Sequence, residues 1–328
     1  MSQMITGAWI SQIVYVVAKL DLADRIAESP RTSDQLARET GTHPQAMSRL
    51  LRASSTIGVF RIAETGEYHL TPLAESLQGG VPGSQKALAI MMGEEHYRCW
   101  GELLYSVRTG KKAFDHLYGQ PIFEYLGQHP EQARIFDAAM TSVHGRESGP
   151  MAKAYNFAQF KTLADIGGGN GSLLIEILRE HPGVKGILYD LPGVIERTRA
   201  NIERAGMSDR TQLIPGNFFE SIPAGADAYL MRHIIHDWND EQCGTILGNV
   251  HQVLGPEGKL LIAESVITDG DEPFFGKLLD LTMLLIPGGQ ERTEKEYRHL
   301  LQTNGFELTQ VVPTASEVSF IEGIKVSN

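Results

Sequence analysis

The sequence predicts an α/β fold, with a doubly wound domain in the C-terminal half preceded by a mostly α-helical winged-helix module. Beyond Phe160, short apolar runs alternate with amphipathic segments of helical length, whereas the signals before it are helical apart from one hairpin. Strands that alternate with helices form a parallel sheet covered on both faces, and ligands bind at the carboxyl ends of its strands. The expected strands are residues 162–166, 186–189, 211–214, 228–231 and 259–264.

The N-terminal module begins with a helix, a tight turn and a second helix within residues 32–53. Thr32 and Gln35 have the spacing of a capping box, and Gly41 is placed to end the first helix. Thr42 follows directly and is expected to cap the second helix. A short β-hairpin after this pair of helices would complete a winged helix.

That hairpin is predicted at residues 59–70, and winged helices often bind DNA through their second helix, here around Gln45, Arg49 and Arg52. The charge balance argues against DNA, because acidic residues offset the arginines of the module and the whole chain has 29 Lys and Arg against 40 Asp and Glu. We therefore expect no nucleic acid partner. A winged-helix regulator stays as an alternative, and dimerisation or a part in a substrate wall is the favoured role of the module.

The first twenty residues predict a helix with one wide apolar stripe. The segment has no basic leader and Asp21 follows it directly, so it is not interpreted as a signal peptide. Such a stripe must be buried against another surface, and a second subunit would provide one. Its members are Ile5, Trp9, Ile13, Val16, Val17 and Leu20.

Length and composition bound the remaining possibilities. The chain has 328 residues, 42% of them hydrophobic, which fits one large or two ordinary globular domains. No apolar run reaches membrane-spanning length, so no membrane partner is expected. Cys99 and Cys243 have neither metal-ligand nor redox spacing, which predicts a reducing, cytoplasmic location and no metal site.

The domain boundaries are predicted from one glycine- and proline-containing segment and one change of pattern. Residues 79–83 separate the winged helix from a run of helices that reaches to about Tyr155. We therefore expect three parts: a winged-helix dimerisation domain at residues 1–95, a helical linker and substrate wall at residues 96–155, and the α/β domain at residues 156–328.

A glycine-rich loop follows the first expected strand and is a candidate ligand site. Residues 165–172 read DIGGGNGS and lead into a helix, and glycines there let the backbone approach a ligand closely. Ser172 stands where a dinucleotide fingerprint would have Gly or Ala, so the spacing favours a methyltransferase-type loop. Asp190, at the end of the second strand, is placed to accept hydrogen bonds from both hydroxyls of a ribose.

Five segments in this order resemble one known family. They are DIGGG at residues 165–169, DLP at 190–192, GNFF at 216–219, HDW at 236–238 and GGQERT at 288–293. The chain resembles, over nearly its whole length, the plant and bacterial small-molecule O-methyltransferases, which include caffeate, isoflavone, polyketide and phenazine enzymes. The resemblance implies a Rossmann-like methyltransferase domain and a homodimer formed through the N-terminal domain.

The resemblance also implies the cofactor S-adenosylmethionine, with S-adenosylhomocysteine as product. Asp190 would hold the ribose, and the glycine loop would lie along the methionine part. Asn217 stands where the family has an aspartate and Arg232 where it often has a lysine. The cofactor-binding residues implied in this way are Gly167, Gly169, Gly171, Asp190, Leu191, Asn217, Phe218 and Arg232.

Methyl transfer to a hydroxyl group requires a base, because a phenol has a pKa of about 10. His236 lies just beyond an expected strand, at the ligand edge of the sheet, and matches the family's catalytic histidine in the HDW segment. His233 is the competing candidate and is interpreted as a packing or strand-end residue. Glu264 and Glu291 match the two glutamates that flank the histidine in the family, and Asp237 is interpreted as a local turn former.

The acceptor is expected to be a small aromatic compound whose hydroxyl belongs to a phenol, a quinone or a heteroaromatic ring. The residues that the resemblance places along its pocket are Trp100, Phe136, Met140, His144, Met283 and Ile286, and ordinary helical packing, or for His144 a solvated position, is the alternative for each. A second alternative for the whole protein is a relative that binds the cofactor but carries out decarboxylation or hydroxylation.

Overall fold

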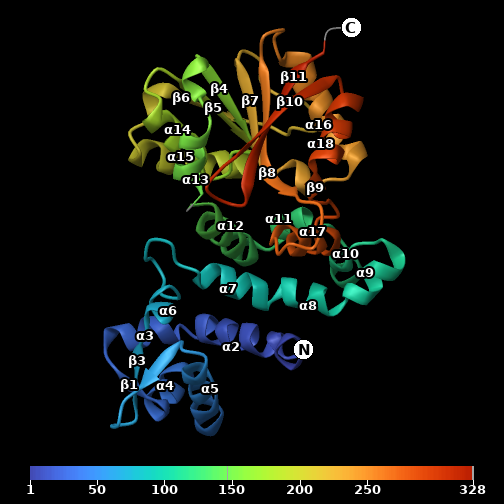
Figure 1. Cartoon of the computed structure of the whole chain (residues 1–328). Helices are drawn as coiled ribbons and strands as arrows, with labels where there is room; N and C mark the ends of the chain where they lie inside the picture. The colour runs from blue at the N-terminus through green and yellow to red at the C-terminus, as the bar shows by residue number, and fades with distance from the viewer. Residues whose placement is uncertain (146, 327–328) are drawn as a thin grey trace. The chain divides into compact units, whose positions relative to one another are not determined.

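The computed structural model describes residues 1–145 and 147–326, and the chain divides into two compact units. The first unit comprises Met1–Gly101 and Glu124–Val143, and the second comprises Glu102–Phe123 and His144–Asn328. The expected linker at residues 96–155 is thus shared between the two units, and the three-part division stays a prediction. Figure 1 labels the elements of both units.

The first unit is mostly helical and contains one small sheet. Its elements are α1 (Ser2–Ile5), α2 (Gly7–Lys19), α3 (Leu22–Glu28), β1 (Arg31–Thr32), α4 (Ser33–Thr40), α5 (Pro44–Thr56), β2 (Phe60–Ile62), β3 (Glu67–Leu70), α6 (Pro72–Glu75), α7 (Lys86–Gly93), α8 (Glu95–Gly101), most of α11 (Ile122–Gln128) and most of α12 (Pro130–Gly145).

The winged helix has the expected caps, with one exception. Thr32 and Gln35 form a full capping box on α4, and Gly41 ends that helix in a left-handed conformation. The expectation for Thr42 is wrong: α5 begins at Pro44, whose fixed φ suits the first helical position, so the cap position falls on His43, which makes no side-chain cap hydrogen bond. The predicted hairpin forms antiparallel strands β2 and β3, and the two-residue β1 adds to its edge.

The apolar stripe of the N-terminal helices is only partly covered within the first unit. Val17 is fully buried, and Ile13 packs against the same cluster around Leu22 and Leu36. In contrast, Ile5 is 73% exposed and Trp9 is 70% exposed. The outer half of the stripe therefore presents large apolar side chains to the surface of this unit.

The second unit contains a large sheet with helices on both faces (Figure 1). Its strands are β4 (Thr162–Ile166), β5 (Lys185–Asp190), β6 (Thr211–Pro215), β7 (Ala228–Arg232), β8 (Lys259–Ile267), β9 (Arg292–Thr293), β10 (Phe306–Pro313) and β11 (Val318–Lys325). Its helices are α9 (Leu103–Thr109), α10 (Ala113–Tyr118), α13 (Ser148–Ala154), η1 (Phe157–Gln159), α14 (Ser172–Glu180), α15 (Pro192–Arg204), η2 (Ser208–Arg210), η3 (Ile235–Asp237), α16 (Asp240–Val253), α17 (Gly276–Leu285) and α18 (Glu294–Thr303).

The strand order is β10-β11-β8-β7-β4-β5-β6, so the sheet is mixed. All five expected strands are present and parallel to one another. The expectation of a wholly parallel sheet is wrong, because β10 and β11 form an antiparallel pair at one edge. The order reverses between β4 and β7, and such a switch point is where open α/β sheets bind their ligands.

Two apolar clusters hold the helices on the sheet. Side chains of α13, α14 and α15 pack with Leu163 and Leu230 on one face. Side chains of α16 and α18 pack with Ala164 and Tyr229 on the other. Among the residues that the structure describes, no helix is long and apolar enough to cross a membrane.

Candidate active site

The turn that carries His236 lies at the carboxyl end of β7, beside the switch point. His233 leaves the strand in a left-handed conformation, and the chain then forms the single 3-10 turn η3. The backbone N–H groups of Ile234 and His236 both donate to Oε1 of Glu264, each over 3.1 Å. Glu264 is fully buried within β8, three residues before the strand ends, and it therefore fixes the main chain of the turn.

The imidazole of His236 is held by Glu291. Its Nδ1 lies 2.6 Å from Oε1 of Glu291, and both residues are buried. The backbone N–H of Glu291 donates to Asp280 on α17 over 2.8 Å, which fixes the glutamate in turn. A carboxylate on Nδ1 selects the tautomer with the proton on that nitrogen and leaves the Nε2 lone pair available to accept a proton. Of the two glutamates expected to flank the ring, only Glu291 contacts it, since Glu264 contacts the main chain.

The charges around His236 favour its protonated form. Burial alone lowers the pKa of the imidazole, but the charge of Asp237, the hydrogen bond and charge of Glu291, and the charge of Glu264 together raise the pKa to about 10. Tyr297 donates its hydroxyl to the second oxygen of Glu264. Burial and the nearby carboxylates raise the pKa of Tyr297 well above its usual value, so the phenol stays a donor.

Asp237 is more than the local turn former that its position suggests. Its Oδ1 lies 3.7 Å from Nε2 of His236, on the side of the ring opposite Glu291. Burial raises the pKa of this carboxyl to about 7, although the charge of His236 opposes the rise. The imidazole therefore has an acidic group at each nitrogen, one in hydrogen-bond contact and one at a longer distance.

His233 has a different environment from His236. Its backbone N–H donates to Ala263 over 3.2 Å, which matches the expected strand-end hydrogen bond. Its ring lies 5.1 Å from the ring of His236, and its Nε2 lies 3.7 Å from Glu147. Burial lowers the pKa of His233, so this imidazole is the less basic of the two.

The glycine loop forms the other half of the site, between β4 and α14. Gly167, Gly169 and Gly171 all have positive φ angles, which only glycine adopts without strain. Asp190, at the end of β5, accepts the N–H of Gly169 over 2.8 Å and the N–H of Leu191 over 2.7 Å. A carboxylate has about four lone-pair sites, so this side chain can accept from ligand hydroxyls in addition to the backbone.

Arg232 closes the loop from the side of β7. It donates to Ser148 over 3.0 Å and to Ser172 over 3.2 Å, and so joins α13 to the start of α14. Asp165 is buried nearby, and burial raises its pKa to about 7 while the charge of Arg232 opposes the rise. Arg232 is therefore not placed as an unpaired cation that awaits a ligand, because its guanidinium donates to the side chains of Ser148 and Ser172.

The residues expected around an adenine gather after β5 and β6. Leu191 is 52% exposed, and Phe218 is partly buried with its ring 6.2 Å from the ring of Trp238. The carboxamide oxygen of Asn217 accepts the N–H of Phe219 over 3.0 Å, and its Nδ2 donates to Glu220 over 3.3 Å. One lone pair of the amide oxygen is left to accept from a ligand amino group.

A family model described as an O-methyltransferase domain matches residues 100–307, which include both halves of this site. The chain belongs to the O-methyltransferase family. A second model, described as an O-methyltransferase dimerisation domain, matches residues 2–79. The match to the O-methyltransferase domain covers strands β4 to β9, the glycine loop and the turn that carries His236.

Members of the O-methyltransferase family resemble this chain over its whole length. Phenazine O-methyltransferase PhzM of Lysobacter antibioticus is 43% identical over 320 residues, which cover 98% of this chain and 94% of that protein. The crystal structure of LaPhzM has a TM-score of 0.95 at 43% identity and covers 99% of this chain and 98% of that one. NcsB1, an O-methyltransferase from neocarzinostatin biosynthesis solved with S-adenosylmethionine and 2-hydroxy-5-methyl naphthoic acid, has a TM-score of 0.86 at 31% identity, covering 97% and 96%.

The residues that the family resemblance places along an acceptor pocket fall in both units. Met283 on α17 and the adjoining Ile286 are buried in the second unit. Trp100 at the end of α8, together with Phe136 and Met140 on α12, belongs to the first unit, where all three are partly buried. The side chain of His144 lies outside the described part of the chain. Their contact with an acceptor stays a prediction.

Sequence reasoning missed two side chains that support the surroundings of His236. Asp280 lies on the amphipathic helix α17 and holds Glu291, while Tyr297 lies on α18 and holds Glu264. Tyr297 is three residues beyond the start of a helix with an apolar face, so its sequence position indicates ordinary packing. Nothing in the local pattern around either residue points to His236.

Proposed function

We propose that this protein transfers the methyl group of S-adenosylmethionine to a hydroxyl group of a small aromatic metabolite, with His236 as the general base. The observation that carries the proposal is the 2.6 Å contact between Nδ1 of His236 and Glu291 at the carboxyl edge of the sheet. S-adenosylmethionine, when bound, supplies an electrophilic methyl group on a sulfonium. The chain's own residues supply a ribose acceptor, an aligned base and a buried charge network.

The polar groups at the glycine loop fit this cofactor. Asp190 keeps acceptor capacity beside a loop whose backbone is open because it lacks side chains. The exposed Leu191 and the ring of Phe218 provide apolar surface for a purine, and Asn217 keeps an acceptor for an exocyclic amine. Arg232 is assigned to positioning in this proposal, because it holds Ser148 and Ser172.

His236 accepts the hydroxyl proton at Nε2, and Glu291 stabilises the imidazolium that results. The buried carboxylates raise the pKa of the imidazole to about 10. A phenol has a pKa of about 10, so the proton moves between groups of matched basicity. The same charges keep His236 protonated at neutral pH in the resting protein, so we expect activity to rise as the pH approaches that pKa.

The acceptor proposed is an aromatic natural-product intermediate with a free ring hydroxyl. The relatives named above act on a phenazine or were solved with a hydroxynaphthoic acid, and both are fused aromatic rings. An apolar wall and one base favour such a planar compound, since most of its surface is buried without polar partners. Met283 and Ile286 are proposed for that wall.

We further propose a homodimer formed through the N-terminal domain. The segment that matches the dimerisation model includes α2, whose Trp9 is 70% exposed in the single chain. Exposed apolar side chains of this size are typical of surfaces that a second copy covers. Trp9→Asp should weaken the dimer in analytical ultracentrifugation, and an unchanged association constant would contradict this assignment.

A methyl-transfer screen tests the main proposal. The protein is incubated with S-adenosylmethionine carrying a deuterated methyl group and with naphthols, hydroxyquinones and hydroxyphenazines, and products are identified by mass spectrometry. We expect labelled methyl on an oxygen of at least one of them, and no label on matched rings that lack the hydroxyl. Label on the matched rings would contradict oxygen as the acceptor. Cofactor binding without transfer to any hydroxyl in a broad panel would contradict the proposed reaction.

A further inference from the structure

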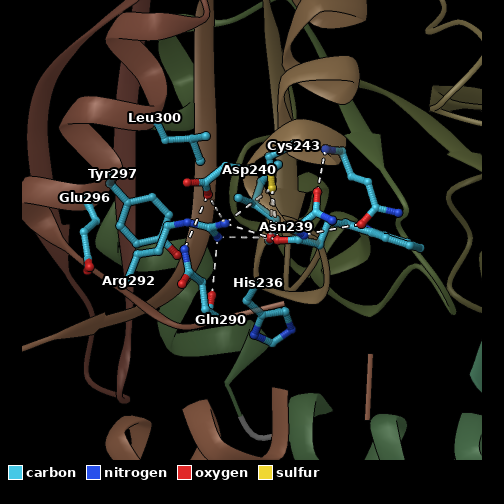
Figure 2. A network of polar contacts seen from close by, with 12 residues as sticks. His236, Asn239, Asp240, Cys243, Gln290, Arg292, Glu296, Tyr297 and Leu300 are labelled. Carbon is cyan, nitrogen blue, oxygen red and sulfur yellow. Dashed lines mark hydrogen bonds and ion pairs between the residues drawn. The ribbon is translucent and has the colours of Figure 1, made fainter. Parts of the chain in front are cut away.

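Arg292 is the largest fully buried side chain in the described part of the protein, and it lies directly behind the catalytic turn. It belongs to β9 and is 1% exposed. A guanidinium carries five N–H donors, and burying it is costly unless acceptors surround it. Figure 2 shows it between Gln290 and Asp240, with the ring of His236 below it in the view.

The acceptors of Arg292 lie on both sides of His236 along the chain. Nη1 donates to the carbonyl of Ile235 over 3.2 Å, and Nη2 donates to the carbonyl of Trp238 over 3.1 Å. Nη2 also pairs with Asp240 over 2.7 Å, and that carboxylate is 64% exposed. One planar group thus closes the turn at the residue before His236 and at the second residue after it.

The residues just before Arg292 hold the same turn from another direction. Gly289 lies so close to the turn that a Cβ atom on residue 289 would be 2.0 Å from the carbonyl oxygen of His236. The N–H of Gln290 donates to that oxygen over 2.9 Å, and Glu291 accepts from the ring. The segment from Gly289 to Arg292 therefore packs against the turn and contacts it through backbone and side chains.

The Glu291 to His236 contact depends on how these two segments are aligned. A carboxylate and a ring nitrogen 2.6 Å apart tolerate little displacement. Among the described residues, the other hydrogen bond between His236 and this segment is the one that its carbonyl accepts from the N–H of Gln290. Arg292 adds two hydrogen bonds and an ion pair across the same boundary. Its planar, forked donors can satisfy two carbonyls at once, which a lysine ammonium at the end of a flexible chain does less well.

We infer that Arg292 is a positioning residue, which aligns the catalytic turn with Glu291 and so sets the orientation and basicity of His236. This inference rests on the proposed function, because it assigns Arg292 to the service of the proposed base. Arg292 does not itself reach the acceptor or the reacting atoms. Asp240 is its exposed counter-ion and holds the outer side of the guanidinium.

The test compares Arg292→Lys with Arg298→Lys, a matched change on α18 where the arginine is half exposed and pairs with Glu294. We expect Arg292→Lys to lower kcat on the order of 10- to 100-fold, as small misplacements of catalytic groups do. The dissociation constant for S-adenosylhomocysteine, measured by calorimetry, should stay within about twofold, because the hydrogen bonds of Arg292 to other described residues all lie outside the glycine loop. Arg298→Lys should change neither quantity.

A second readout separates positioning from general support of the fold. The His236 ring is titrated by NMR in protein with labelled histidine, with His236→Ala identifying the signal. The groups that act on this ring are Glu291, Asp237, Glu264 and the neighbouring His233. In Arg292→Lys the loosened contact with Glu291 should lower the pKa of His236 by at least about half a unit. A folded variant with wild-type kcat and an unchanged pKa would overturn the inference.

Asp240→Ala covers the case in which Arg292→Lys does not fold. Asp240 is largely exposed, so its loss leaves the buried contacts in place but frees one side of the guanidinium. We expect a shift of the His236 pKa in the same direction and of smaller size, and the absence of any shift would count against the inference. The two hypotheses fail in different ways. Wild-type turnover in His236→Ala would refute His236 as the base, whereas the titration still shows whether Arg292 affects the pKa of the His236 ring.

Discussion

The side chain of Ile234 fills the space beside the backbone of Gly167, so that a Cβ atom at residue 167 would lie 2.4 Å from Cδ1 of Ile234. Gly167 begins the glycine loop, and Ile234 lies two residues before His236, the proposed base. The two halves of the site are therefore in direct contact, and the missing side chain at residue 167 is what permits it. A change at this glycine should disturb both the glycine loop and the turn that carries His236.

Gly167→Ala should weaken the binding of S-adenosylmethionine and lower kcat together. The backbone at residue 167 has a positive φ angle, which strains an alanine, and the added methyl group would clash with Ile234. Either the loop or the turn must therefore move. We expect a loss of cofactor affinity on the order of 10-fold or more in calorimetry. Gly183→Ala is the matched control, because a Cβ atom there meets nothing within 4 Å. Equal affinities for the two variants would contradict the packing described.

Glu291→Gln should move the pH dependence of kcat/KM to lower pH. The amide oxygen can still accept from Nδ1, but the negative charge that raises the pKa of His236 is gone. A lower pKa means that the neutral, proton-accepting imidazole is populated at lower pH, so the acid limb shifts down by about 1–3 units. The plateau should fall as well, because the imidazolium loses its counter-charge. Glu294→Gln, on the exposed surface of α18, should leave the profile in place.

Glu264 should matter for stability in a way that depends on the replacement. Glu264→Ala would leave the N–H groups of Ile234 and His236 and the hydroxyl of Tyr297 without an acceptor. Unpaired buried donors cost about 1–3 kcal/mol each, so we expect a large fall in thermal midpoint. Glu264→Gln keeps an oxygen for both N–H groups and should be much milder. Equal midpoints for the two variants in thermal unfolding would show that these hydrogen bonds do not hold the turn.

The central strands could be predicted from the sequence because they are short apolar runs bounded by helices. The strands β10 and β11 were missed, since Thr309 and Gln310 interrupt the alternating pattern of β10 and β11 carries Glu322 near its middle. Glu322 is buried because Lys259 and Tyr155 satisfy its carboxylate. That pairing joins residues far apart in the chain, and no local pattern reveals it.

The residues around the turn that carries His236 could be predicted from the sequence, but not how they contact one another. Glu264 and Glu291 have the same side chain, yet Glu291 binds the imidazole and Glu264 binds the main chain. Their positions in the folded chain decide this difference. Arg292 follows Glu291 directly, yet the carbonyls of Ile235 and Trp238 that it binds lie more than fifty residues earlier in the chain. Such contacts follow from the packing of the strands, which the order of residues does not specify.

The most direct test of His236 as the general base is the rate of methyl transfer by His236→Ala at saturating cofactor and acceptor. We predict a fall on the order of 10²–10⁴, because the variant lacks the base, with the dissociation constant for S-adenosylmethionine nearly unchanged. The remaining rate should rise with pH as the free phenol ionises. Turnover close to that of the wild type, with the same pH profile, would show that His236 is not the base.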